Sequence, residues 1–150
     1  MRRTRSRPRG CSRKAQRCGC RSGFQKKIKT VLNLRGPAPG KEWFDRELDV
    51  VRTAGAEHIS IRMSANREPD ERTISNLVST LTNVKTPLLI HCEGGADRSG
   101  LAAALYERAV KHRSTTDATA QLSFRYGHFP WLTSRTGAMD RAFAHFIQAH

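Results

Sequence analysis

Hydrophobic and polar residues change along the chain with two different periods, which predict strands and helices in turn. Short apolar runs bounded by turn residues predict strands at 27–36, 58–64 and 86–91. Longer stretches with apolar residues three and four positions apart predict helices at 41–55, 69–83, 99–113, 116–125 and 135–148. Because strands and helices alternate, we expect an α/β fold with three layers, in which helices flank a mostly parallel central sheet.

The helix at 69–83 has the clearest amphipathic pattern. Its apolar residues fall at positions i, i+3, i+4 and i+7: Ile74, Leu77, Val78 and Leu81. Asp70 comes directly after a proline and before a second acidic residue, which suits the positive end of a helix. We therefore expect this helix to bury one face against the sheet.

The strand at 86–91 is apolar on consecutive positions, which is typical of a strand covered on both faces. That pattern predicts a position at the centre of a parallel sheet. Ligands in such folds bind at the carboxyl ends of the strands. Cys92 lies at that end of this strand, so we expect the functional site there.

Charge divides the chain into two parts. Residues 1–29 contain 12 Lys and Arg and no Asp or Glu, whereas the rest of the chain contains 15 basic and 13 acidic residues. The net charge of +14 is therefore a property of the N-terminal segment. We predict a basic, disordered tail at 1–27 and one catalytic domain at 28–150.

A basic tail of this kind can bind nucleic acid or an anionic membrane through charge alone. The alternative is a solvated extension without a function. The tail has no apolar run, so it resembles neither a signal peptide nor a membrane helix, and a cytoplasmic location is expected.

Three of the four cysteines lie in the tail: Cys11, Cys18 and Cys20. Their spacing does not match a zinc site, so we expect no metal. Cys92 stands alone in the domain and is expected to be a free thiol.

The segment HCEGGADRSG, residues 91–100, joins the apolar strand to a helix. Gly94 and Gly95 allow the backbone to curl with its N–H groups pointing inward, and the start of the helix adds further free N–H groups. The guanidinium of Arg98 can bind two oxygens of a phosphate at once. These features predict a cradle for a tetrahedral oxyanion.

A thiol in this positive environment is expected to have a lowered pKa and to be a nucleophile at neutral pH. The Cys92 thiolate can then attack a bound phosphate, and Ser99 can donate a hydrogen bond that helps the sulfur to depart. We expect His91 to orient the loop rather than to act as the base.

The same segment resembles the H-C-x5-R-S/T-G loop of the cysteine-dependent protein tyrosine and dual-specificity phosphatases. The matching residues are His91, Cys92, Gly95, Arg98, Ser99 and Gly100. The resemblance extends over about residues 28–148 and indicates a compact bacterial member. It implies a strand–loop–helix active site and two-step hydrolysis of phosphate monoesters through a cysteinyl-phosphate, without metal or cofactor. It also implies that the loop binds the phosphate, through Glu93, Gly94, Gly95, Ala96, Asp97 and Arg98.

The chain departs from these relatives at the general acid. They usually carry an Asp on a separate loop about thirty residues before the cysteine, where this chain reads RMSANREPDER. We expect Asp97, inside the loop, to be the acid, because it is already close to the leaving group. The alternative acids are Asp70 and Glu68, although Asp70 is more simply a helix N-terminal charge.

Several substrates, and two other classes of protein, are consistent with the sequence. The substrate is a phosphorylated protein or a small phosphomonoester, and an inositol phosphate or phosphoinositide is the alternative. Glu93 is expected to disfavour polyanions by like-charge repulsion. A rhodanese is less consistent with Arg98, and a phosphate-binding module that docks through its tail is less consistent with an intact Cys92.

Overall fold

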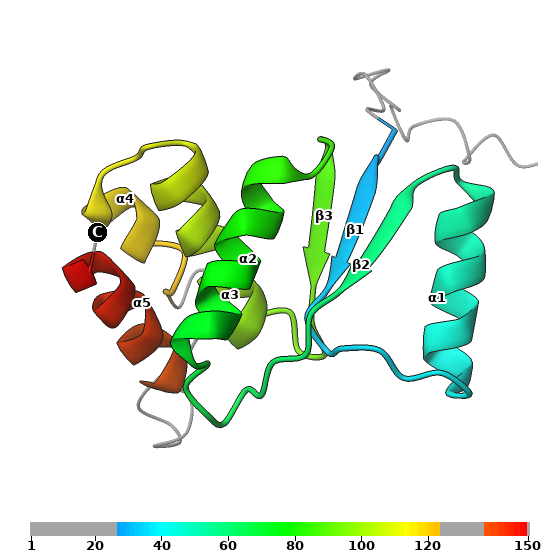
Figure 1. The fold of residues 1–150 in the computed structure, drawn as a ribbon, viewed down its shortest axis with the longest axis horizontal. Helices are drawn as coiled ribbons and strands as arrows, with labels where there is room; N and C mark the ends of the chain where they lie inside the picture. Colours follow the sequence, from blue (N-terminus) through cyan, green and yellow to red (C-terminus); the bar gives the residue numbers. More distant parts are fainter. Residues whose placement is uncertain (1–26, 124–136, 150) are drawn as a thin grey trace, which may run out of the picture.

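The computed structural model describes residues 27–123 and 137–149. These contain three strands: β1 (Thr30–Asn33), β2 (Glu57–Ser60) and β3 (Leu88–His91). They also contain the α-helices α1 (Glu42–Thr53), α2 (Glu71–Asn83), α3 (Asp97–Leu105), α4 (Thr115–Thr119) and α5 (Gly137–Ala149). A π-helical turn, η1 (Tyr106–Val110), continues α3 (Figure 1).

The strands form a parallel sheet in the order β2-β1-β3. All four residues of β1 are buried, whereas Leu89 of β3 is 47% exposed. Within the described residues, β1 is thus the central strand, and the predicted central position of the 86–91 strand is wrong. Consecutive apolar residues do not distinguish a central strand from one that pairs on a single side, because both can have their faces covered.

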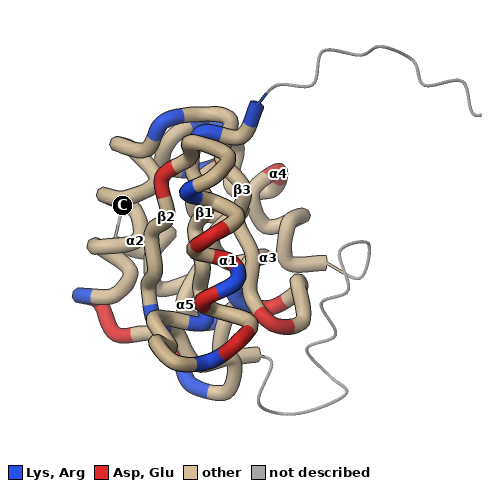
Figure 2. Tube along the Cα trace, turned by 90° about the vertical axis from the view of Figure 1, so that its right-hand side faces the viewer, with Lys and Arg blue, Asp and Glu red and all other residues tan. Residues whose placement is uncertain are grey.

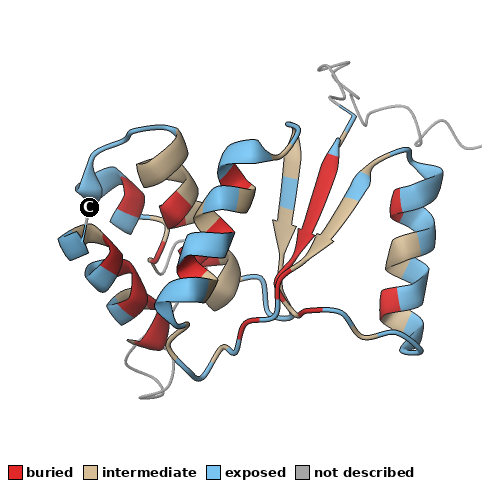
Figure 3. Ribbon diagram, in the orientation of Figure 1, coloured by how far each residue is buried: buried red, intermediate tan, exposed pale blue. Residues whose placement is uncertain are grey.

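Helices lie on both faces of the sheet, as expected for an α/β fold. In Figure 1, α1 covers one face, while α2 and α3 cover the other, with α4 and α5 packed outside α3. The main core lies on the α2–α3 side (Figure 3). It includes Leu32 of β1, Leu77 and Leu81 of α2, and Leu101 of α3, which confirms the amphipathic pattern predicted for 69–83.

Most predicted elements exist, but their bounds differ. The 58–64 strand ends at Ser60, although the Ile61 N–H still donates to the Asn33 carbonyl at 2.9 Å. The 99–113 helix begins earlier, at Asp97, and its α-helical part ends at Leu105. The predicted tail lies outside the described residues except for Lys27, as do parts of the two predicted C-terminal helices.

The parallel arrangement brings three connections to one edge of the sheet. The segments after β1, β2 and β3 all leave the strands at their carboxyl ends (Figure 1). The β3–α3 connection contains Cys92, so the cysteine lies at the edge where parallel sheets bind ligands. Among the helices described, none has the length and apolar character that crossing a membrane requires.

Candidate active site

The loop after β3 turns tightly around the Cys92 sulfur. His91 ends β3, Cys92 follows, and α3 begins at Asp97. Gly95 has a φ of 70°, a left-handed conformation that favours glycine, and its N–H donates to Cys92 Sγ at 3.2 Å. The predicted curl of the loop is therefore present, with a backbone donor directed at the sulfur.

Two opposing influences act on the thiol of Cys92. Partial burial raises the pKa of Cys92, because it disfavours the charged thiolate. Hydrogen bonds from Ser99 and Gly95 and the positive charge of Arg98 lower it, and their combined effect leaves the pKa below its ordinary value. The Ser99 Oγ lies 3.6 Å from Sγ. The site thus favours a thiolate, the form that acts as a nucleophile.

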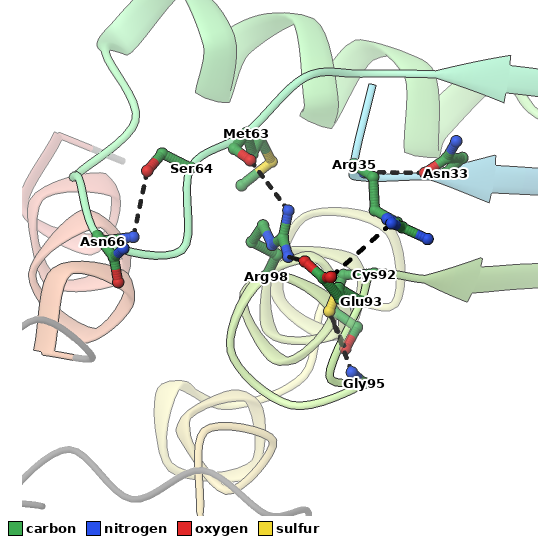
Figure 4. Close-up of polar contacts among 10 residues, drawn as sticks. Asn33, Arg35, Met63, Ser64, Asn66, Cys92, Glu93, Gly95 and Arg98 are labelled. Atoms are coloured by element: carbon green, nitrogen blue, oxygen red, sulfur yellow. Dashed lines mark hydrogen bonds and ion pairs between the residues drawn. The ribbon is translucent and has the colours of Figure 1, made fainter. Parts of the chain in front are cut away.

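Arg98 lies across the same loop with its side chain only 11% exposed. Its Nη1 donates to the Met63 carbonyl at 3.2 Å, while Nη2 lies 3.9 Å from Glu93 Oε2 (Figure 4). The Nε atom is buried and has no hydrogen-bond partner. The Nε–Nη2 edge of the guanidinium is therefore the edge left for a ligand, and it suits two oxygens of a phosphate.

The first turn of α3 completes the cradle with backbone groups. The N–H groups at the start of a helix have no intrahelical partner, and the helix dipole gives that end a partial positive charge. The Gly100 N–H already donates to the Ala96 carbonyl at 2.7 Å.

Gly100 is also packed tightly, since a Cβ there would lie 3.2 Å from Leu122 Cδ2. This glycine allows the turn to sit close to the segment after α4.

Below the loop, a carboxylate joins two histidines from different strands. Glu47 of α1 has its Oε1 atom 2.6 Å from His58 Nε2 and 3.0 Å from His91 Nε2. Their side chains are mostly buried, at 21%, 10% and 27% exposed. A carboxylate oxygen in this position can accept a hydrogen bond from an Nε2–H of each histidine. Sequence reasoning did not find Glu47 or His58, because they are far from His91 along the chain.

A second group lies at the mouth of the loop. Arg35, which follows β1, lies over the ring of Trp43 at 3.5 Å from its centroid. Its Nη2 is 3.8 Å from Glu93 Oε1 (Figure 4). The sequence places Arg35 at a strand's carboxyl end but gives no sign of its contact with Trp43.

The three candidate acids lie in different environments. Asp97 is the first residue of α3, within the loop region. Asp70 caps α2, where it accepts from the Thr73 N–H at 2.8 Å, and these bonds from Thr73 lower the pKa of Asp70. Glu68 pairs with His145 at 2.6 Å and with Arg141 at 3.4 Å, both on α5. The contacts of Asp70 and Glu68 are thus with helices rather than with the cradle.

Metal ligation was not expected for the domain. In the ranges 27–123 and 137–149, no group of three or more His, Cys, Asp or Glu side chains is arranged to hold a metal ion. Cys11, Cys18 and Cys20 lie outside these ranges.

A family model matches most of the chain. The model is that of PTP-SAK, the DSP-PTPase phosphatase domain of Swiss Army Knife proteins, and it matches residues 4–136. No curated protein sequence matches the chain.

Solved structures match the fold at low sequence identity. The DUF442 protein of Shewanella putrefaciens CN-32 has a TM-score of 0.60 at 16% identity, covering 84% of this chain and 75% of that one. The kinase associated phosphatase has a TM-score of 0.56 at 20% identity, covering 83% and 72%. TpbA of Pseudomonas aeruginosa has a TM-score of 0.55 at 19% identity, covering 79% and 68%, and a cysteine-to-serine variant of TpbA was solved with phosphotyrosine.

Proposed function

The chain belongs to the PTP-SAK family of DSP-PTPase phosphatase domains, a cysteine-dependent class, and we propose that it hydrolyses phosphomonoesters through a cysteinyl-phosphate on Cys92. One observation carries this proposal. The Cys92 sulfur and the unpartnered Nε of Arg98 belong to the same short loop, at the start of α3. A nucleophile and a guanidinium edge placed this way suit a phosphate lying between them.

In the first step, the loop N–H groups and the Nε–Nη2 edge of Arg98 bind the phosphate oxygens. The Cys92 thiolate attacks phosphorus, an S–P bond forms and the P–O bond to the leaving group breaks. The positive charge that stabilises the transition state comes from Arg98 and the helix start, so the proposed reaction requires no metal.

In the second step, water attacks the phosphorus of the cysteinyl-phosphate. The S–P bond breaks, inorganic phosphate is released and the thiolate returns. Ser99 stabilises the departing sulfur through the 3.6 Å Oγ–Sγ contact. His91 acts indirectly by orienting the loop, since its Nε2 is held by Glu47 rather than facing the substrate.

Asp97 is the proposed general acid. It gives a proton to the leaving oxygen in the first step and takes one from the attacking water in the second. Its place within the loop supports this role, whereas Asp70 and Glu68 have their contacts on α2 and α5. A lowered pKa also suits Asp70 poorly to donating a proton near neutral pH.

The substrates are proposed to be those of tyrosine and dual-specificity phosphatases, with phosphotyrosine as the first to try. The complex of the TpbA variant with phosphotyrosine supports that choice. The loop and Arg98 hold only the phosphate group, so the same chemistry serves other phosphomonoesters.

The decisive experiment measures hydrolysis of p-nitrophenyl phosphate in EDTA and reductant. Wild type should turn over without metal, and Cys92→Ser should be inactive while its thermal unfolding stays unchanged. A folded wild-type protein without turnover would overturn the proposal in favour of a phosphate-binding module.

The acid is tested with Asp97→Asn and two leaving groups. Turnover should fall far more for an alkyl phosphate than for p-nitrophenyl phosphate, because a good leaving group needs little protonation. An equal loss for both substrates would exclude Asp97 as the acid. In that case, Asp70→Asn and Glu68→Gln become the variants to compare.

A further inference from the structure

Glu93, the residue directly after the nucleophile, lies between two arginines. Its Oε1 is 3.8 Å from Arg35 Nη2, and its Oε2 is 3.9 Å from Arg98 Nη2. Figure 4 shows the two guanidinium groups directed at this one carboxylate from different elements. The two guanidinium groups are therefore close enough together for a single carboxylate to contact both.

The carboxylate is held weakly in this position. Both contacts are longer than a charge-assisted hydrogen bond, and the Glu93 side chain is 73% exposed. An exposed ion pair contributes little to stability, whereas a hydrogen bond to a charged group contributes more. A bound phosphate can therefore displace Glu93 from either arginine.

Arg35 is fixed more firmly than a surface arginine. Its guanidinium stacks on Trp43 at 3.5 Å, and its side chain is only 27% exposed. Its backbone N–H donates to Asn33 Oδ1 at 2.8 Å, where Asn33 is fully buried. Less side-chain entropy is then lost when Arg35 binds an anion, which is the condition for a specific binding position.

We propose that Arg35 forms a second anion-binding position beside the cradle. The preferred substrates are then small molecules that carry a second phosphate next to the one that is hydrolysed. The cradle and Arg98 bind the reacting phosphate, Arg35 binds its neighbour, and Glu93 moves outward into solvent. This inference rests on the proposed function and names the substrate class of the same site.

The net charge at the mouth of the loop is not the negative charge that Glu93 alone would give. Glu93 alone would repel polyanions, but two arginines within 4 Å leave this group of three side chains net positive. With Glu93 displaced, both guanidinium groups face the ligand. The geometry thus favours a doubly charged ligand over a single phosphate.

A small molecule fits this geometry better than an acidic peptide does. Arg35 shares a carboxylate with Arg98, so the second anion must lie at nearly the same depth as the reacting phosphate. Phosphotyrosine reaches the cradle through a long side chain, and an Asp or Glu on a neighbouring residue is shorter and is displaced along the chain. Two phosphates on adjacent atoms of one small molecule meet the requirement.

The test compares pyrophosphate with orthophosphate as competitive inhibitors of p-nitrophenyl phosphate hydrolysis. In wild type, pyrophosphate should bind about tenfold more tightly, the gain expected from one additional charged contact. In Arg35→Gln this ratio should fall to about one. The matched control is Arg46→Gln, which removes the same charge from an exposed arginine paired with Glu42. It should keep the wild-type ratio.

Substrate turnover gives the second measurement. kcat/KM for an inositol bisphosphate with adjacent phosphates should exceed that for an inositol monophosphate, and Arg35→Gln should remove the difference. Equal ratios in wild type and Arg35→Gln, alongside Cys92-dependent turnover of p-nitrophenyl phosphate, would overturn the inference and leave the proposed function standing. An Arg35-dependent gain confined to acid-flanked phosphotyrosine peptides would also overturn it.

Discussion

At Cys92, burial and hydrogen bonding act on the thiol in opposite directions, and hydrogen bonding prevails. Burial raises the pKa of Cys92, while Ser99, Gly95 and Arg98 together lower it below the ordinary value. The thiolate should therefore persist to lower pH than that of a free cysteine. The reactivity of Cys92 should be lost as the pH falls through this lowered pKa.

Replacing Ser99 by Ala should move that pH dependence upward. The variant loses the hydroxyl that lies 3.6 Å from Sγ, so the raising effect of burial is less strongly opposed. Inactivation by iodoacetamide, measured against pH, should show a higher midpoint in Ser99→Ala than in wild type. Ser79→Ala, on the exposed side of α2, is the control and should leave the midpoint unchanged. A midpoint that does not move in Ser99→Ala would show that Ser99 does not stabilise the thiolate.

Gly36 and Gly40 provide a matched pair in the connection between β1 and α1. Both have positive φ, at 85° and 81°. A Cβ on Gly36 would lie 2.6 Å from Arg62 Cβ, whereas a Cβ on Gly40 meets nothing within 4 Å. Each substitution by Ala should cost about 1–2 kcal/mol for the left-handed backbone. Gly36→Ala should cost about 1–3 kcal/mol more, because of the clash.

Urea unfolding of the two glycine variants measures the difference directly. The free energy of unfolding should fall more in Gly36→Ala than in Gly40→Ala. Equal losses would mean that the backbone segment carrying Arg62 moves aside, and that the close approach of these segments is not required.

At the scale of elements, Glu47 ties helix α1 to strands β2 and β3, and its contact on β3 is with His91, the residue before Cys92. Glu47→Gln keeps the shape of the side chain but removes its charge, so the contacts to His58 and His91 weaken. We expect a loss of about 1–2 kcal/mol in the free energy of unfolding. We also expect a several-fold fall in kcat with little change in KM, since His91 orients the loop but is not proposed to touch the substrate.

The control for this prediction is Glu42→Gln on the same helix. Glu42 pairs with Arg46 at 2.6 Å, but both side chains are exposed, and such pairs contribute little. Glu42→Gln should leave both unfolding and kcat unchanged. If Glu47→Gln lowers stability but not kcat, the cluster only holds α1 against the sheet.

Local signals predicted much of the fold, and they fail where partners come from distant elements. The period of apolar residues located α2, and the strand–glycine–helix pattern located the loop around Cys92. The position of β3 in the sheet depends on which strands pair, and no pattern within 86–91 encodes that choice. Likewise, Glu47 meets His91 only because α1 crosses the sheet in one particular place. The contact of Arg35 with Trp43 has the same origin.

At the scale of the whole molecule, charge separates the described domain from the N-terminal segment. Figure 2 shows acidic and basic residues interspersed along α1. Beyond residue 29, the chain has 15 basic and 13 acidic residues. The strong positive charge is confined to the first 29 residues. We propose that this segment binds polyanions such as RNA independently of the catalytic domain.

Deleting residues 1–26 tests the proposed division into a tail and a domain. The deletion removes ten Lys and Arg but no residue of the core, and exposed charges are screened beyond about 8 Å at physiological salt. We expect kcat/KM for p-nitrophenyl phosphate and the thermal unfolding midpoint to stay unchanged. Binding of the full chain to RNA should weaken steeply as salt rises, and the deletion should abolish it.

The family match begins at residue 4, so a loss of stability and turnover in the shortened chain would locate the domain boundary. If the shortened chain unfolds at a lower temperature and loses turnover, residues before 28 belong to the catalytic domain, and the boundary at 28 is wrong.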